Sequence, residues 1–193
     1  MKKLSLLAAL LILCLPLAAS AQDEAPKIEI FGGYSYRRFD SGDGFGSVSF
    51  HGFNTSLAGN ITKHIGIVGE FSRFNKKLAS INVPELGQFN VDVGLWTYLF
   101  GPRATLHRGK AEPFVHALFG GARASAGVSV PGFSEGGAVT GFASALGGGL
   151  DVKVSDNFAI RVAQLDYLGS RFEGELSGDF RYSVGIVIRL GKR

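Results

Sequence analysis

The sequence contains little cysteine, tryptophan, methionine and charge. Of its 193 residues one is Cys, one is Trp and one is Met, and charged residues make up 19%. Low charge combined with 11% aromatic residues excludes an intrinsically disordered chain, which needs high charge and few aromatics. After residue 21 no run approaches the roughly 18 apolar residues of a membrane-spanning helix, which excludes a helical membrane protein.

Glycine, in contrast, is abundant, with 28 residues. These glycines show no three-residue repeat, which excludes a collagen-like chain. A helical bundle is disfavoured as well, because each glycine inside a helix costs about 1 kcal/mol relative to alanine. The length suits a single domain, and the composition favours β-structure for it.

The first 21 residues have the form of a secretory signal peptide. Lys2 and Lys3 give a basic start, residues 4–17 are apolar, and Ala19-Ser20-Ala21 supplies small residues before a cleavage point. We therefore expect an exported protein whose mature domain spans residues 22–193.

Cleavage of residues 1–21 changes the charge and the chemistry of the chain. Removing Lys2 and Lys3 from the 20 basic residues leaves 18 against 16 acidic residues, a net charge of +2. A nucleic-acid partner therefore loses its main support. Cys14 is removed too, so disulfides and thiolate catalysis are excluded from the mature chain.

The remaining chain alternates in polarity over segments of about ten residues, as β-strands do. Eight strands are predicted at 27–38, 50–61, 65–74, 90–101, 113–125, 141–153, 158–168 and 179–190. The connections at 62–64 and 154–157 are short, and that at 102–112 is of middle length. The long connections are 39–49, 75–89, 126–140 and 169–178. Unequal connections around eight such strands are typical of a transmembrane β-barrel.

The charged face of each strand carries small residues, and the uncharged face carries bulky apolar ones. In 179–190 the bulky set is Phe180, Tyr182, Val184, Ile186, Ile188 and Leu190. A soluble barrel has the opposite arrangement, with large apolar groups filling its interior. We therefore predict that the bulky face meets lipid. In 90–101 this rule places Val91, Val93, Leu95, Thr97 and Leu99 outward and Asp92, Gly94 and Trp96 inward.

The inward charges are predicted to form a polar network in the lumen. Its members are Glu29, Arg37, Glu70, Asp92, Asp151, Lys153, Arg161, Arg181 and Arg189. We place His116 inside as well, and a β-bulge near Val162-Ala163 is needed to turn Gln164 and Asp166 into the lumen. We interpret the network as a satisfied polar plug, since eight strands leave an interior that side chains fill. The alternative is a narrow ion path.

Three segments resemble a known family: 32–36 (GGYSY), 65–71 (IGIVGEF) and 182–187 (YSVGIV). They are similar to strands of the small outer-membrane β-barrel proteins, the OmpA/OmpX-like eight-stranded barrels. The resemblance covers nearly all of 27–190. It implies a Gram-negative outer-membrane protein that the barrel-assembly machinery inserts, with short periplasmic turns and mobile extracellular loops. Family members usually end on an aromatic residue, whereas this sequence ends Leu190-Gly191-Lys192-Arg193.

Three outward faces end in arginine at the predicted external side: Arg38, Arg73 and Arg123. A guanidinium matches the geometry of a phosphate, so these residues are candidates for contact with lipopolysaccharide. The competing interpretation is interfacial snorkelling without a specific ligand.

Neither catalysis nor metal binding is predicted. The histidines, His51, His64, His107 and His116, form no Ser–His–acid arrangement that the pattern reveals. The segment 40–44 (DSGDG) has the start of a calcium loop but lacks the later ligands. We expect no catalytic residue, cofactor or metal.

The sequence therefore predicts a monomeric, all-β, eight-stranded antiparallel up-and-down barrel in the outer membrane. Its expected role is structural or interactive: it stabilises the envelope and presents the long loops to an extracellular partner. A narrow porin-like channel is one alternative. A soluble, periplasmic lipocalin-like binding barrel is the other.

Overall fold

The computed structural model describes six stretches of the chain: residues 25–40, 47–83, 87–107, 109–130, 133–172 and 175–192. The predicted signal peptide, 1–21, lies outside them, as do 41–46, 84–86, 131–132 and 173–174 within the four predicted long loops. Within the described residues, no helix is long and apolar enough to span a membrane.

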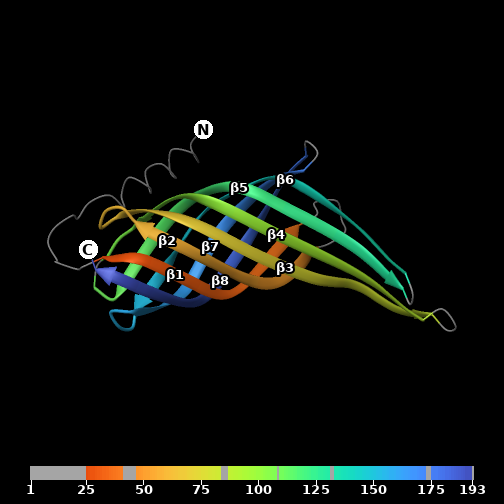
Figure 1. Cartoon of the computed structure of the whole chain (residues 1–193), viewed down its shortest axis with the longest axis horizontal. Helices are drawn as coiled ribbons and strands as arrows, with labels where there is room; N and C mark the ends of the chain where they lie inside the picture. The colour runs from red at the N-terminus through yellow and green to blue at the C-terminus, as the bar shows by residue number, and fades with distance from the viewer. Residues whose placement is uncertain are drawn as a thin grey trace.

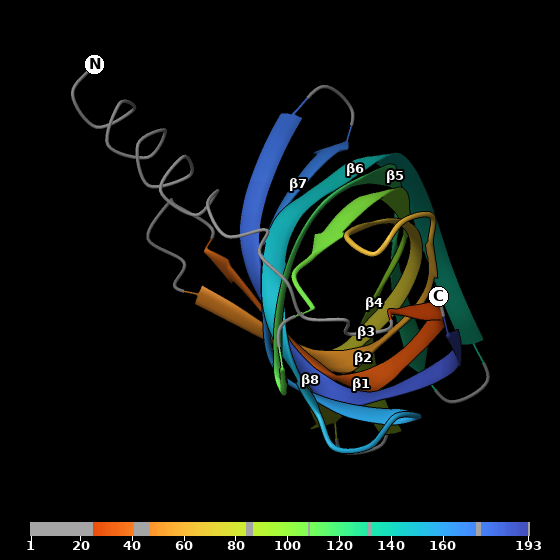
Figure 2. The ribbon, with the colours of Figure 1, turned by 90° about the vertical axis from the view of Figure 1, so that its left-hand side faces the viewer.

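Eight antiparallel strands close into one barrel in the order β1 to β8, with β8 pairing back onto β1 (Figures 1 and 2). The strands are β1 Pro26–Asp40, β2 Ser47–Asn60, β3 Ile65–Val83, β4 Gly87–Thr105, β5 Ala111–Val130, β6 Phe133–Lys153, β7 Phe158–Phe172 and β8 Glu175–Lys192. The predicted fold class is confirmed.

The short turns 61–64, 106–110 and 154–157 share one end of the barrel with the start of β1 and the end of β8. We call it the turn end. The turns are held by the backbone: the amide of Ile61 donates to the carbonyl of Ile65, and the amide of Val154 donates to that of Phe158. Tight closure at this end fixes the register of the strands above it.

The wall of the barrel is apolar outside and polar inside, as predicted for most strands. Large apolar side chains are exposed all around it, among them Leu146 at 67% and Phe180 at 64%. Glu29, Arg161 and Arg181 on the opposite faces are at most 3% exposed. A soluble protein does not expose apolar residues over its whole circumference, so this surface suits lipid.

The predicted faces of β4 are wrong. Thr97 and Leu99 are buried in the lumen, whereas Tyr98 is 50% and Phe100 is 61% exposed. Trp96, predicted inside, shares the outward face with these two aromatic residues. Valine and leucine on one face suggested an outward surface there, but the larger aromatic side chains of the other face have no room in a narrow lumen.

The β-bulge predicted in β7 is confirmed. The register of β7 shifts between Arg161 and Gln164 against β8, and between Leu150 and Asp151 of β6 on the other side. The extra residue at Val162 keeps both Arg161 and Gln164 buried in the lumen.

Strands β3 to β6 are much longer than predicted and continue beyond the closed barrel (Figure 1). The pairing of β2 with β3 ends at His51–Asn75, and that of β6 with β7 ends at Phe142–Arg171. Past these pairs, β3-β4 and β5-β6 run on as a four-stranded sheet, which we call the extension. The predicted loops 75–89 and 126–140 are therefore mostly strand.

Candidate functional site

The centre of the lumen is occupied by a buried ion cluster around Arg181 on β8. Its Nη2 lies 2.5 Å from Oε1 of Glu70 and 2.6 Å from Oδ2 of Asp166. Its Nη1 also donates to Oγ of Ser72, at 3.3 Å. One guanidinium thus ties β3, β7 and β8 together across the lumen.

Further polar groups complete this central cluster. Nε2 of His116 lies 2.7 Å from Oδ1 of Asp166, so His116 is inside as predicted. The amide of Gln164 donates to Asp166 at 2.8 Å and to Glu70 at 3.2 Å, and Asn54 donates to Glu70 at 3.1 Å. These hydrogen bonds link three further wall positions, His116, Gln164 and Asn54, to the two carboxylates, as a buried polar network requires.

A second cluster lies nearer the turn end. Arg103 bridges two carboxylates, with Nη1 2.6 Å from Glu29 and Nη2 3.2 Å from Asp151. Nε of Arg161 lies 2.8 Å from the same Asp151. Both guanidinium groups stack on the ring of Phe114, each 4.3 Å from its centroid. Stacking and pairing together hold these charges in a filled lumen.

Two further ion pairs extend the network along the barrel axis. Arg189 donates to both carboxylate oxygens of Glu112 near the turn end. Towards the extension, Arg37 pairs with Asp179 through two contacts of 2.5 Å. Buried apolar residues of the wall form one cluster besides these charged groups, made of Ala58, Val68, Leu99, Leu118, Ala122, Ala143, Ala145 and Leu168.

Glycine on the inner face of β6 makes space for this network. A Cβ at Gly147 would lie 2.1 Å from Oδ1 of Asp166, and one at Gly149 would lie 2.8 Å from the ring of Phe114. Carbonyl groups of neighbouring strands are equally near. The triple glycine at 147–149 therefore permits close approach of backbone and side chains.

Seven of the nine predicted lumen residues are buried and ion-paired; Asp92 and Lys153 are the exceptions. Asp92 is exposed on β4, since the faces of that strand are the reverse of the predicted ones. Lys153 lies at the rim, 3.1 Å from Asp156 of the adjacent turn. That hydrogen bond, with the charge of Lys192, lowers the pKa of the exposed Asp156 carboxyl.

Three partners in the network were not predicted: Arg103, Glu112 and Asp179. The first two fall in a segment, 102–112, that was assigned to a turn, although β4 continues to Thr105 and β5 begins at Ala111. Asp179 shares the parity of Arg181 and Arg189 on β8. The alternation of β8 could therefore have identified Asp179 as an inward residue. Arg103 and Glu112 could not be found in this way, because the predicted strands end at residue 101 and begin again at residue 113.

Two of the three predicted outward arginines, Arg73 and Arg123, lie at the base of the extension. The guanidinium of Arg73 on β3 stacks on Trp96 of β4, 4.2 Å from the ring centroid. Arg123 of β5 stands in register with Trp96 on its other side. Arg73, Trp96 and Arg123, which we call the arginine patch, line one groove on the outer wall together with Lys76 and Asp92. Arg38 is exposed on β1, paired in register with Ser49, outside this groove.

Comparison with known proteins identifies the family. Residues 5–189 match the family described as "Outer membrane protein beta-barrel domain". The chain belongs to this family. No curated protein matches significantly.

Solved structures of outer membrane barrels share the fold. Ail, the attachment invasion locus protein of Yersinia pestis, in complex with the heparin analogue sucrose octasulfate, is 20% identical and has a TM-score of 0.63; the match covers 84% of this chain and 99% of Ail. Neisserial surface protein A is 12% identical with a TM-score of 0.55, covering 88% and 100%.

Membership of the outer membrane β-barrel family places the chain in the outer membrane, as predicted, and the soluble lipocalin-like alternative is wrong. Barrels of this family have short periplasmic turns and longer extracellular segments. The turn end corresponds to the periplasmic side by this rule, and the extension to the extracellular side.

Proposed function

We propose that this outer membrane β-barrel is a plugged structural anchor that holds the extension at the cell surface and binds anionic groups through the arginine patch. It stabilises the envelope by contacting lipopolysaccharide phosphates. The observation that carries the proposal is the row of Arg73, Trp96 and Arg123 across three neighbouring strands, at the point where the sheet leaves the barrel.

The filled lumen supports the proposal that the barrel is an anchor and not a channel. Arg37, Arg103, Arg161, Arg181 and Arg189 are each at most 4% exposed and each contacts a carboxylate. Moving ions through this lumen would require breaking several buried ion pairs, each expensive to separate. We therefore expect no ion conduction: planar-bilayer recordings of refolded protein should show no single-channel steps, and regular steps would favour the narrow porin.

The charge of the outer groove supports the proposal that the ligand is anionic. Two guanidinium groups, those of Arg73 and Arg123, line the groove with one carboxylate, that of Asp92. Trp96 fixes the Arg73 guanidinium by stacking, and Nε of Arg73 donates to Oδ1 of Asn75 at 3.4 Å, so the two Nη groups are the donors left for an external acceptor. The structure of Ail with sucrose octasulfate shows that a barrel of similar fold carries a polyanion.

Trp96 is the sole tryptophan of the chain and reports on binding directly. Protein refolded in a zwitterionic detergent is titrated with lipopolysaccharide while Trp96 fluorescence is followed. We expect binding that weakens with salt, and Arg73→Gln combined with Arg123→Gln should weaken it about tenfold or more, because two charge-assisted contacts are lost.

The matched control is Lys63→Gln, an exposed cation in a turn at the other end of the barrel. It should leave the affinity unchanged. Competition with sucrose octasulfate separates a general polyanion site from one that needs the lipid. Equal affinity of the double variant and the wild type would contradict the proposed role of the arginine patch.

A further inference from the structure

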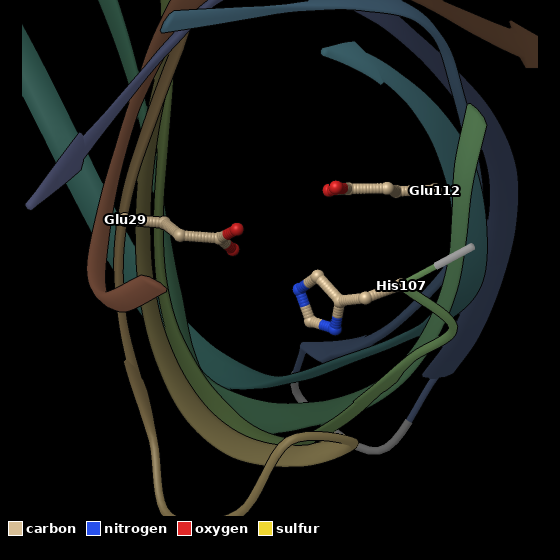
Figure 3. Close-up of side chains that lie close together, drawn as sticks. All are labelled: Glu29, His107 and Glu112. Atoms are coloured by element: carbon tan, nitrogen blue, oxygen red, sulfur yellow. The ribbon is translucent and has the colours of Figure 1, made fainter. Parts of the chain in front are cut away.

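Two carboxylates and a histidine converge inside the lumen at the turn end, apart from the arginine patch. Glu29 projects from β1, Glu112 from the start of β5, and His107 from the turn between β4 and β5 (Figure 3). One ligand atom of each lies within 4.8 Å of those of the other two. Glu29 is 2% and Glu112 is 4% exposed.

Hydrogen bonding within the described residues leaves this group incomplete. Both ring nitrogens of His107 are buried and have no hydrogen-bond partner there, and the same holds for Oε1 of Glu29. A neutral imidazole carries one donor and one acceptor nitrogen. Leaving such groups without a hydrogen bond costs about 1–3 kcal/mol each, so a ligand that contacts them here would be stabilised by them.

We propose that Glu29, His107 and Glu112 form a binding site for a divalent transition-metal ion of the zinc class. One imidazole and two carboxylates are three ligands of the kinds that Zn²⁺ uses, with a fourth position left for water. Ligand atoms around tetrahedral zinc lie about 3.4 Å apart, so shifts of about an ångström would close the site. His107 is in a turn, where such a shift is easiest.

Arginines orient both carboxylates from behind. Arg103 holds Oε2 of Glu29 at 2.6 Å, which leaves Oε1 turned towards His107. Arg189 holds Glu112 by two hydrogen bonds, and its Nε is 3.8 Å from Oε1 of Glu29. Partners of this kind position metal ligands in known sites.

The same arginines determine which ion binds. Their positive charge opposes binding that is purely ionic, as with Ca²⁺ and Mg²⁺, which also prefer oxygen ligands only. Bonding to the imidazole nitrogen favours Zn²⁺ and its neighbours in the transition series. The site is therefore expected to be selective for such ions, and His107 is its one half-buried member.

The test uses metal-free, untagged, refolded protein in detergent, titrated with zinc chloride by calorimetry at pH 7. We expect one zinc per chain and no response to calcium or magnesium at the same concentration. His107→Ala should weaken zinc binding by about tenfold or more, the order of loss seen when a metal site is disrupted. X-ray absorption should show an imidazole nitrogen in the zinc shell of the wild type.

The matched control is His64→Ala in the neighbouring turn, whose Nδ1 lies 3.2 Å from the carbonyl oxygen of Thr105. It should bind zinc as the wild type does. Should His107→Ala not fold, as judged by heat-modifiable migration in gels, the absorption spectrum of the wild type decides. Absence of stoichiometric zinc binding, undiminished binding by His107→Ala, or a zinc shell without imidazole would each overturn the proposal.

Discussion

The closed barrel and the extension are built from the same strands but are stabilised differently. In the barrel every strand has two neighbours, and buried ion pairs cross the lumen. In the extension, residues 76–83 of β3 and 133–141 of β6 each have one neighbouring strand in the described part of the chain. Residues 135–140 are all exposed. Substitutions in the lumen should therefore lower the free energy of unfolding strongly, while substitutions in the extension should change it little.

The largest contrast is expected from removing a lumen charge. Arg181→Met leaves Glu70 and Asp166 buried without their main cation, which should cost about 3–5 kcal/mol in the free energy of unfolding. Urea unfolding in phospholipid vesicles, followed by Trp96 fluorescence, measures it. Arg171→Met, an exposed arginine on β7, should change the value by less than about 0.5 kcal/mol.

Removing the charges of Glu70 and Asp166 as well tests whether unpaired charge causes the loss. Adding Glu70→Gln and Asp166→Asn to Arg181→Met should restore part of the lost stability, because no unpaired charge then stays buried. No recovery would mean that packing, and not charge, sets the stability of the lumen.

Replacing one glycine by alanine in each region compares how much stability a single added methyl group costs in the barrel and in the extension. Gly147→Ala places a Cβ against Asp166 and should cost about 1–3 kcal/mol through overpacking. Gly137→Ala in the extension meets nothing within 4 Å and should stay within about 0.5 kcal/mol of the wild type. Equal losses in the two variants, measured by the same unfolding assay, would refute the assigned difference.

Shortening the extension should leave the barrel intact. Deleting 128–135 joins Gly127 to Gly136, which form a two-residue turn closing the registered pair Ala126–Gly137. Since no lumen ion pair is touched, we expect a change below about 1 kcal/mol in the free energy of unfolding. Failure of this variant to refold into vesicles would show that the extension is needed for barrel formation.

The smallest effect is expected at the turn end. Asp156 has a pKa below its usual value because Lys153 and Lys192 favour its charged form, so its contribution to stability is present above the ordinary pKa and is lost as the pH falls through the lowered one. In a plot of the free energy of unfolding against pH, Asp156→Asn should show a slightly smaller loss of stability on acidification. Below the lowered pKa of Asp156, the variant and the wild type should be equally stable. The site is fully exposed, so screening keeps the difference small.

Alternation predicted the closed barrel well because lipid and a narrow lumen impose opposite demands on each strand. The faces of β1, β2, β3 and β8 follow from bulky residues outside and small or charged ones inside. In β4 both faces carry large residues, and only the width of the lumen decides that Trp96, Tyr98 and Phe100 lie outside. The alternation of residues along one strand does not reveal how wide the lumen is.

The extension and the pairing of charges were beyond the reach of the sequence for a different reason. Stretches such as 126–140 are rich in glycine, serine and alanine, so they show no alternation, yet β5 and β6 stay paired up to Val130–Phe133. Partners such as Arg103 and Glu29 lie 74 positions apart and meet only across the closed lumen. Which arginine faces which acid depends on strand tilt and stagger.

The bulge in β7 makes one point of the wall tolerant of a change in chain length. There Val162 is accommodated as an extra residue, its carbonyl accepting a hydrogen bond from the hydroxyl of Tyr182, and the residues after it keep their faces. A single insertion or deletion elsewhere in the wall would turn charges to lipid over the rest of the strand. Among homologous sequences, gaps of one residue should therefore gather at this bulge and at the tips of the extension.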